Sequence, residues 1–148
     1  MQSSVRTLLC AAFLGASFAQ PAGARAAFSY LTPAQQKAYE CRHAESRGDY
    51  ADSLPICLSA AAAYKQIGDA EKRNPWYSYE VEGYMLETAA RDYAGLHRLP
   101  EALDYALQAH KLLSYVYSNY RMDPDDRKEM AGSIARVAQL VNQIRAKR

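Results

Sequence analysis

The sequence predicts an all-α protein with about five antiparallel helices. Three prolines each follow a polar residue that can cap a helix, and proline is favoured in the first turn. These pairs are Thr32-Pro33, Asn74-Pro75 and Asp123-Pro124. Between the pairs, apolar residues recur every three or four positions, which is the spacing of one helix face. No segment shows the alternating pattern of a β-hairpin.

Residues 1–26 are predicted to form a secretory signal peptide. A single cation, Arg6, precedes an apolar segment at 7–19, and small residues follow in the order that a signal peptidase recognises. Cleavage after Ala26 is the preferred site, with cleavage after Ala24 as the alternative. An uncleaved membrane anchor is the other interpretation, but 13 apolar residues are too few to span a bilayer. We therefore expect an exported protein, in the periplasm if the source is Gram-negative, or secreted.

The mature chain, residues 27–148, has the length of one domain. Cleavage removes two of the 18 basic residues and none of the 16 acidic ones, so the mature chain is formally neutral. Neutrality argues against a nucleic acid partner. The mature chain also has no apolar run of about 18 residues, so we expect no membrane insertion after cleavage.

The five helices are predicted by residue range, with glycine-containing turns between them. The ranges are 33–47, 52–67, 75–96, 100–121 and 124–146. Thr32 and Gln35 form a capping-box pattern at the first start. The second start is ambiguous because a helix from Tyr50 would enclose Pro55, whereas a cap at Asp52 places Pro55 in the first turn, where it is tolerated. We prefer the later start.

Small residues follow two of the turns at positions where helices pack closely. They are Cys57 and Ala60 after Gly48-Asp49-Tyr50, and Ala102, Ala106 and Ala109 after Leu99-Pro100. This pattern resembles tetratricopeptide (TPR/Sel1-like) repeats over most of residues 34–120. The resemblance implies α-hairpins, with residues 124–146 as a terminal capping helix. The equivalent positions lie 49 residues apart in this sequence, whereas a regular array repeats every 34 residues.

Cys41 and Cys57 are the two cysteines of the mature chain. In an antiparallel hairpin centred on Gly48-Asp49, residues whose numbers sum to about 98 face each other, and these two do. We therefore predict a disulfide, with two buried thiols as the alternative. The disulfide would close a loop of about 15 residues and stabilise the fold by about 3 kcal/mol. The chain has no C-x-x-C motif, so redox catalysis is not expected.

No residue pattern indicates catalysis, a cofactor or a metal site. Cys41 and His43 are two positions apart, so they point away from each other on a helix. His110 lies on the apolar stripe of its helix, which favours a packing role. The sequence has no G-x-S-x-G, H-E-x-x-H or glycine-rich phosphate loop. We expect no enzyme activity, no cofactor and no metal.

The expected function is binding of another protein or peptide. The resemblance implies a groove lined by the first helix of each hairpin, with Arg42 and Arg91 at equivalent positions and Tyr84 near the same face. Trp76 and Tyr77 would lie at its edge. Arginines there can hold carboxylates, and tyrosine is favoured at interfaces. For each arginine the alternative is a solvated ion pair with a nearby glutamate.

The sequence leaves two other functions open. The protein can be a structural subunit of an envelope assembly, through self-association, or a helical domain that binds a small ligand. The second alternative predicts an apolar cavity near Trp76.

Overall fold

The computed structural model describes residues 31–147, which form five α-helices. They are α2 (Pro33–Ser46), α3 (Tyr50–Ala70), α4 (Trp76–Gly95), α5 (Leu99–Asn119) and α6 (Pro124–Ala146). No β-strand occurs among these residues. The predicted all-α class and the five antiparallel helices are confirmed. The predicted signal peptide, residues 1–26, lies outside the described part of the chain.

Polar caps begin the first and last of these helices. Thr32 accepts a hydrogen bond from the Gln35 amide, and the Gln35 side chain accepts one from the Thr32 amide, which completes the capping box. The Asp123 carboxylate accepts from the amides of residues 125 and 126. At the start of α4, Pro75 is the cap residue and no side chain caps the helix, so the prediction that Asn74 caps it was wrong.

Helix α3 starts earlier and ends later than the sequence suggested. The Asp49 carbonyl accepts hydrogen bonds from Asp52 and Ser53, so the first turn closes at Tyr50 and Pro55 lies inside the helix. At the other end, a Cβ on Gly68 would lie 2.6 Å from the Tyr79 ring, so this glycine permits close helix packing. The expected turn at Gly68-Asp69 is therefore helical.

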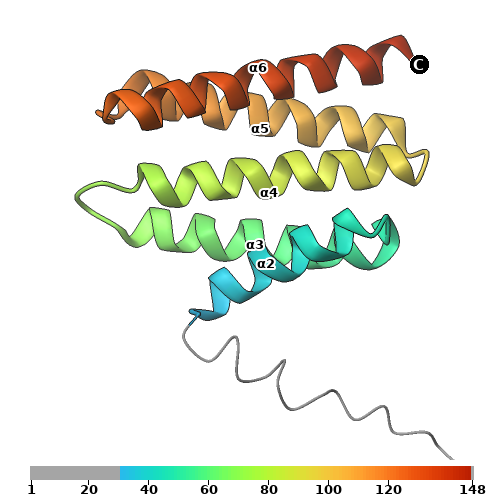
Figure 1. The fold of residues 1–148 in the computed structure, drawn as a ribbon, viewed down its shortest axis with the longest axis horizontal. Coiled ribbons are helices and arrows are strands. Elements are labelled where there is room, and N and C mark those ends of the chain that lie inside the picture. Colours follow the sequence, from blue (N-terminus) through green and yellow to red (C-terminus); the bar gives the residue numbers. More distant parts are fainter. Residues whose placement is uncertain (1–30, 148) are drawn as a thin grey trace, which may run out of the picture. The chain divides into compact units, whose positions relative to one another are not determined.

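Helix α4 lies at the centre of the described fold (Figure 1). It contacts each of the other four helices. Successive helices run antiparallel, so α2, α4 and α6 point one way and α3 and α5 point the other way (Figure 1). The apolar core lies between these two sets, and its largest fully buried side chains are Met85, Leu113, Met130, Val116 and Ile144.

The two helical hairpins repeat with a spacing of 49 residues. Helices α3 and α5 begin at Tyr50 and Leu99, and each is 21 residues long. The turns before them share one geometry, because Gly48 and His97 both have a positive φ, of 76° and 58°. Two hydrogen-bonded residue pairs between α4 and α6, Tyr84–Ser133 and Glu87–Arg136, are also 49 positions apart. The spacing is therefore a property of the packing as well as of the sequence.

The Sγ atoms of Cys41 and Cys57 lie 2.12 Å apart, so the predicted disulfide is present in the structure. It joins α2 to α3 where their Cα atoms approach to 4.8 Å. The equivalent positions of the second hairpin are Ala90 and Ala106, which are also fully buried. Both hairpins thus have a small residue on each helix at this point, and in the first hairpin the two residues are covalently linked.

Candidate functional site

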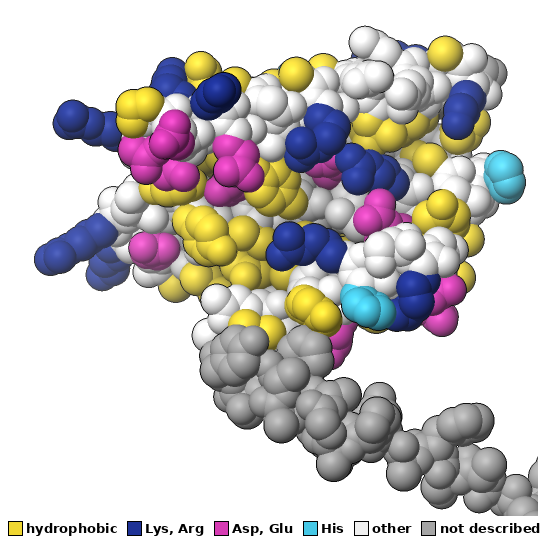
Figure 2. Space-filling model, in the orientation of Figure 1, with side chains coloured by type: hydrophobic (Ala, Val, Ile, Leu, Met, Phe, Trp, Pro, Cys, Tyr) yellow, Lys and Arg dark blue, Asp and Glu magenta, His cyan; other side chains and the backbone are white. Residues whose placement is uncertain are grey.

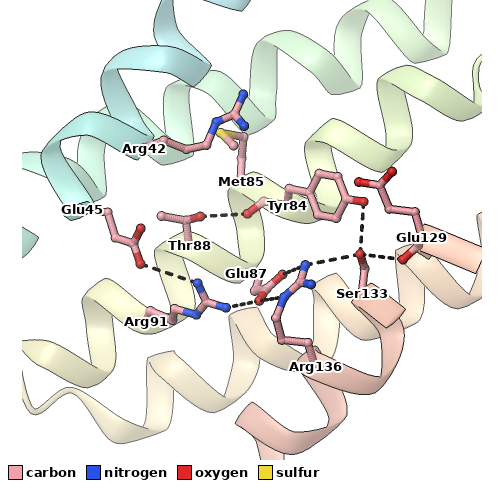
Figure 3. A pocket seen from close by; sticks show the side chains of 10 residues that line it. All are labelled: Arg42, Glu45, Tyr84, Met85, Glu87, Thr88, Arg91, Glu129, Ser133 and Arg136. Carbon is pink, nitrogen blue, oxygen red and sulfur yellow. Dashed lines mark hydrogen bonds and ion pairs between the residues drawn. The ribbon is translucent and has the colours of Figure 1, made fainter. Parts of the chain in front are cut away.

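An open groove of about 380 Å³ crosses the face of α4, between α2 and α6 (Figure 3). Ten side chains from these three helices line it. They are Arg42 and Glu45 of α2, Tyr84, Met85, Glu87, Thr88 and Arg91 of α4, and Glu129, Ser133 and Arg136 of α6. The residues come from positions almost 100 apart in the chain, so the groove exists only in the folded protein.

Glu87 is the central charge of the groove floor. Its side chain is only 4% exposed, and it pairs with the guanidinium groups of Arg91 and Arg136. Arg136 Nε donates to Glu87 Oε1 at 3.0 Å, and its Nη2 donates to Oε2 at 3.3 Å, so this pair is bidentate. Arg91 reaches Glu45 of α2 at 3.6 Å as well. One buried carboxylate therefore joins α4 to α6, and Arg91 extends the network to α2.

A chain of hydrogen bonds runs from Arg136 along the groove to Glu80. Arg136 Nη2 donates to Ser133 Oγ at 3.3 Å, Ser133 Oγ lies 3.1 Å from Tyr84 Oη, and Tyr84 Oη donates to Glu80 Oε1 at 2.7 Å. Burial is the main cause that raises the pKa of Tyr84 above its ordinary value. The phenol is therefore a neutral hydrogen-bond donor at physiological pH.

Arg42 is the groove cation with no ion pair or hydrogen bond among the described residues. It lies on the exposed side of α2, and its guanidinium lies beside Met85, apart from the Arg91 and Arg136 guanidinium groups (Figure 3). Arg91 and Arg136 form ion pairs with Glu87, whereas the charge of Arg42 is not neutralised by a partner among the described residues. It is thus the side chain best placed to attract an acidic group.

The structure brings three of the five expected binding residues into one groove: Arg42, Tyr84 and Arg91. For Arg91, the alternative interpretation, an ion pair with nearby glutamates, is present in the structure. Trp76 and Tyr77 do not line the cavity. Their rings pack edge to face with centroids 6.1 Å apart; Trp76 is half-buried, and Tyr77 is 55% exposed. Tyr77 precedes Tyr84 by two helical turns, so it extends the same face of α4.

The contribution of α6 to the groove was not expected from the sequence, which predicted residues 124–146 only as a terminal capping helix. Glu129, Ser133 and Arg136 of this helix line the groove. A signal was present, because residues 126, 129, 133 and 136 are all polar and recur at spacings of three, four and three. This spacing marks a polar stripe on one helix face.

Residues 31–147 contain neither a metal-binding cluster nor a membrane-spanning helix. No group of three or more His, Cys, Asp or Glu side chains between residues 31 and 147 is arranged to hold a metal ion. None of the five helices is long and apolar enough to cross a membrane. Comparison with known protein families, curated proteins and solved structures finds no significant match to this chain.

Proposed function

We propose that this protein is an exported TPR-like adaptor that binds a segment of another protein in the groove across α4. The observation that carries the proposal is the convergence of Arg42, Tyr84 and Arg91, with part of α6, on one open groove. These residues belong to three helices that run in the same direction (Figure 1). A groove lined by alternate helices of stacked hairpins is the arrangement expected for a helical-repeat binding surface.

The chemistry of the groove supports peptide recognition rather than a reaction. Its charged groups pair mainly with each other and hold three helices in place, which gives a rigid surface. Rigid surfaces lose little conformational entropy when a ligand binds. The unpaired Arg42 and the exposed Tyr77 offer a charge and an aromatic ring to a partner. Export and the disulfide are mutually consistent, because disulfides persist in oxidising compartments.

The test is a selection of peptides from a displayed library of random dodecapeptides on the purified, disulfide-intact protein. Arg42→Glu is the decisive variant, because Arg42 has no ion pair whose loss would unfold the protein. Arg73→Glu, an exposed arginine in the α3–α4 connection, makes the same charge change outside the groove. We expect enriched peptides whose binding falls at least fivefold in Arg42→Glu and is unchanged in Arg73→Glu.

Arg91 is a poorer probe than Arg42. A glutamate at residue 91 would face Glu87 and Glu45 directly, so lost binding would not be separable from a distorted groove. Circular dichroism and thermal unfolding of Arg42→Glu show whether its fold is intact. The groove is not the binding site if Arg42→Glu binds the selected peptides as tightly as the unaltered protein does.

A further inference from the structure

Helix α6 carries a polar stripe whose charge changes sign along the helix. Asp126 and Glu129 are acidic, Ser133 is neutral, and Arg136 is basic. Glu129, Ser133 and Arg136 all line the groove. Ten residues separate Asp126 from Arg136, which corresponds to about 15 Å along a helix axis.

Helix α4, which lies beside α6, has the same order of charges along its length. Glu80 lies near its start and Arg91 near its end, and α4 and α6 run parallel. Contacts between residues 49 positions apart hold the two helices in register, as between Tyr84 and Ser133. The acidic starts of the two stripes therefore lie together, and so do the basic ends.

At the acidic end, three carboxyl groups act on one another. Glu80 is buried, and burial raises its pKa; the negative charges of Glu129 and Asp126 raise it further. The hydrogen bond from Tyr84 opposes this rise, and it is the contributions of Glu129 and Asp126 that indicate a negative potential here. Acidic side chains also gather over the start of α6 in the surface view (Figure 2). This end of the groove is therefore suited to a cation.

At the basic end, the Arg91 and Arg136 guanidinium groups pair with the buried Glu87, and Arg91 also reaches Glu45. Arg42 lines the same groove without an ion pair among the described residues. The accessible charge is thus positive, and Arg42 supplies most of it. Hydrophobic side chains lie between the charged groups on this face (Figure 2), and Tyr84 and Met85 line the groove there.

We propose that the groove selects a segment with separated charges, with a basic residue at the Glu80, Asp126 and Glu129 end and an acidic residue at the Arg42, Arg91 and Arg136 end. A span of about 15 Å equals four to five residues of extended chain. Apolar or aromatic residues between the two charges would contact the half-buried Tyr84 ring. This inference rests on the proposed function, and it adds the charge pattern of the partner.

The peptides selected from the random library provide the first test. We expect them to place Lys or Arg about four or five residues from Asp or Glu, with an apolar residue between. A synthetic peptide of this pattern, acetylated and amidated so that its ends are neutral, then serves as the probe. Replacing its basic residue or its acidic residue by glutamine should weaken binding about fivefold in each case, which is the scale of an exposed charge pair.

Two protein variants assign each charge of the peptide to its end. In Glu129→Lys, replacing the peptide's basic residue by glutamine should no longer weaken binding; in Arg42→Glu, replacing its acidic residue should no longer do so. Arg73→Glu should preserve both effects. Such cycles isolate the pairwise interaction from general loss of binding.

The outcomes separate this inference from the proposed function. If no peptide is enriched, or if the enriched peptides bind Arg42→Glu as tightly as the unaltered protein, the groove is not a peptide site and both proposals fail. If peptides bind and depend on Arg42 but show no paired charges, only the charge pattern is overturned. If the glutamine peptides bind as tightly as the charged one, the charge pattern is again wrong while the adaptor function stands.

Discussion

Oδ2 of Asp92 lies 3.7 Å from Sγ of Cys57, and both residues are fully buried. A sulfur in a disulfide carries no proton, so this contact is not a hydrogen bond. The Ser53 hydroxyl and the positive charge of Arg91 favour the ionised carboxylate, while Oδ1 has no hydrogen-bond partner among the described residues. Burial raises the Asp92 pKa to about 6. The disulfide is therefore packed against a carboxyl group whose charged form is destabilised by burial in the folded protein.

Asp92 should make the protein less stable as the pH rises. Its pKa of about 6 in the folded state exceeds the value near 3.9 of an unfolded aspartate, so the folded protein binds more protons between these values. The stability due to protonated Asp92 is complete below about pH 4 and is lost as the pH rises through 6, by about 3 kcal/mol. Urea unfolding of Asp92→Asn from pH 4 to pH 8 should lack this decrease.

Glu82 also titrates in this range, because partial burial raises its pKa to about 7, and burial raises the pKa of Glu80 above its ordinary value. The comparison is therefore between variant and unaltered protein at each pH. Asp104→Asn, on the exposed side of α5, is the matched control and should keep the full pH dependence. An unchanged profile in Asp92→Asn would show that Asp92 is not the group responsible.

Removing the disulfide should lower the free energy of unfolding by about 3 kcal/mol. Cys41→Ala combined with Cys57→Ala is the appropriate change, because the second hairpin already has Ala90 and Ala106 at the equivalent buried positions. Urea titrations with and without reductant measure the loss. The reductant should destabilise the unaltered protein and leave the double variant unaffected; equal effects on both would contradict a stabilising bridge.

Gly83 of α4 and Gly132 of α6 lie in helices but have opposite surroundings. A Cβ on Gly83 would lie 2.6 Å from Leu113 Cδ2, whereas one on Gly132 would meet nothing within 4 Å. Gly83→Ala should therefore lower the unfolding free energy by about 1–3 kcal/mol through overpacking. Gly132→Ala should raise it by about 0.5–1 kcal/mol, since alanine favours helix. Equal effects in thermal or urea unfolding would contradict this difference in packing.

Glu87→Gln should destabilise the fold because it leaves two guanidinium groups without their shared carboxylate. We expect a loss of about 1–3 kcal/mol, given the burial of Glu87 and the partial exposure of both arginines. Glu101→Gln removes an exposed pair with Arg98 and should cost less. Urea unfolding at neutral pH measures both. Similar losses would mean that the groove network does not join the helices.

The leader should be removed when the protein is expressed with export in a Gram-negative host. The intact mass and N-terminal sequence are expected to begin at Ala27, or at Arg25 if the alternative site is used. Ala24 belongs to both sites, so Ala24→Asp should block processing. A protein that retains Met1 in the periplasmic or envelope fraction would contradict the signal-peptide prediction.

Local patterns predicted much of the fold. The Thr32 and Asp123 caps are visible because each involves residues within three positions of one another. The disulfide was predictable because a short turn at Gly48-Asp49 fixes the register of the hairpin that contains both cysteines. The C-terminal end of α3 was not predictable. Gly68 lies there and packs closely against Tyr79 of the next helix, a contact that no local pattern encodes.

The sequence by itself determined the helical class, the hairpin order and the cysteine pair. Each follows from the period of a helix or the length of a turn. Only the tertiary structure decided that Glu87 is buried between Arg91 and Arg136, and that Asp92 is enclosed beside Cys57. These environments arise because packing places residues from 35 to 49 positions apart in contact, and burial then sets the energy of their charges.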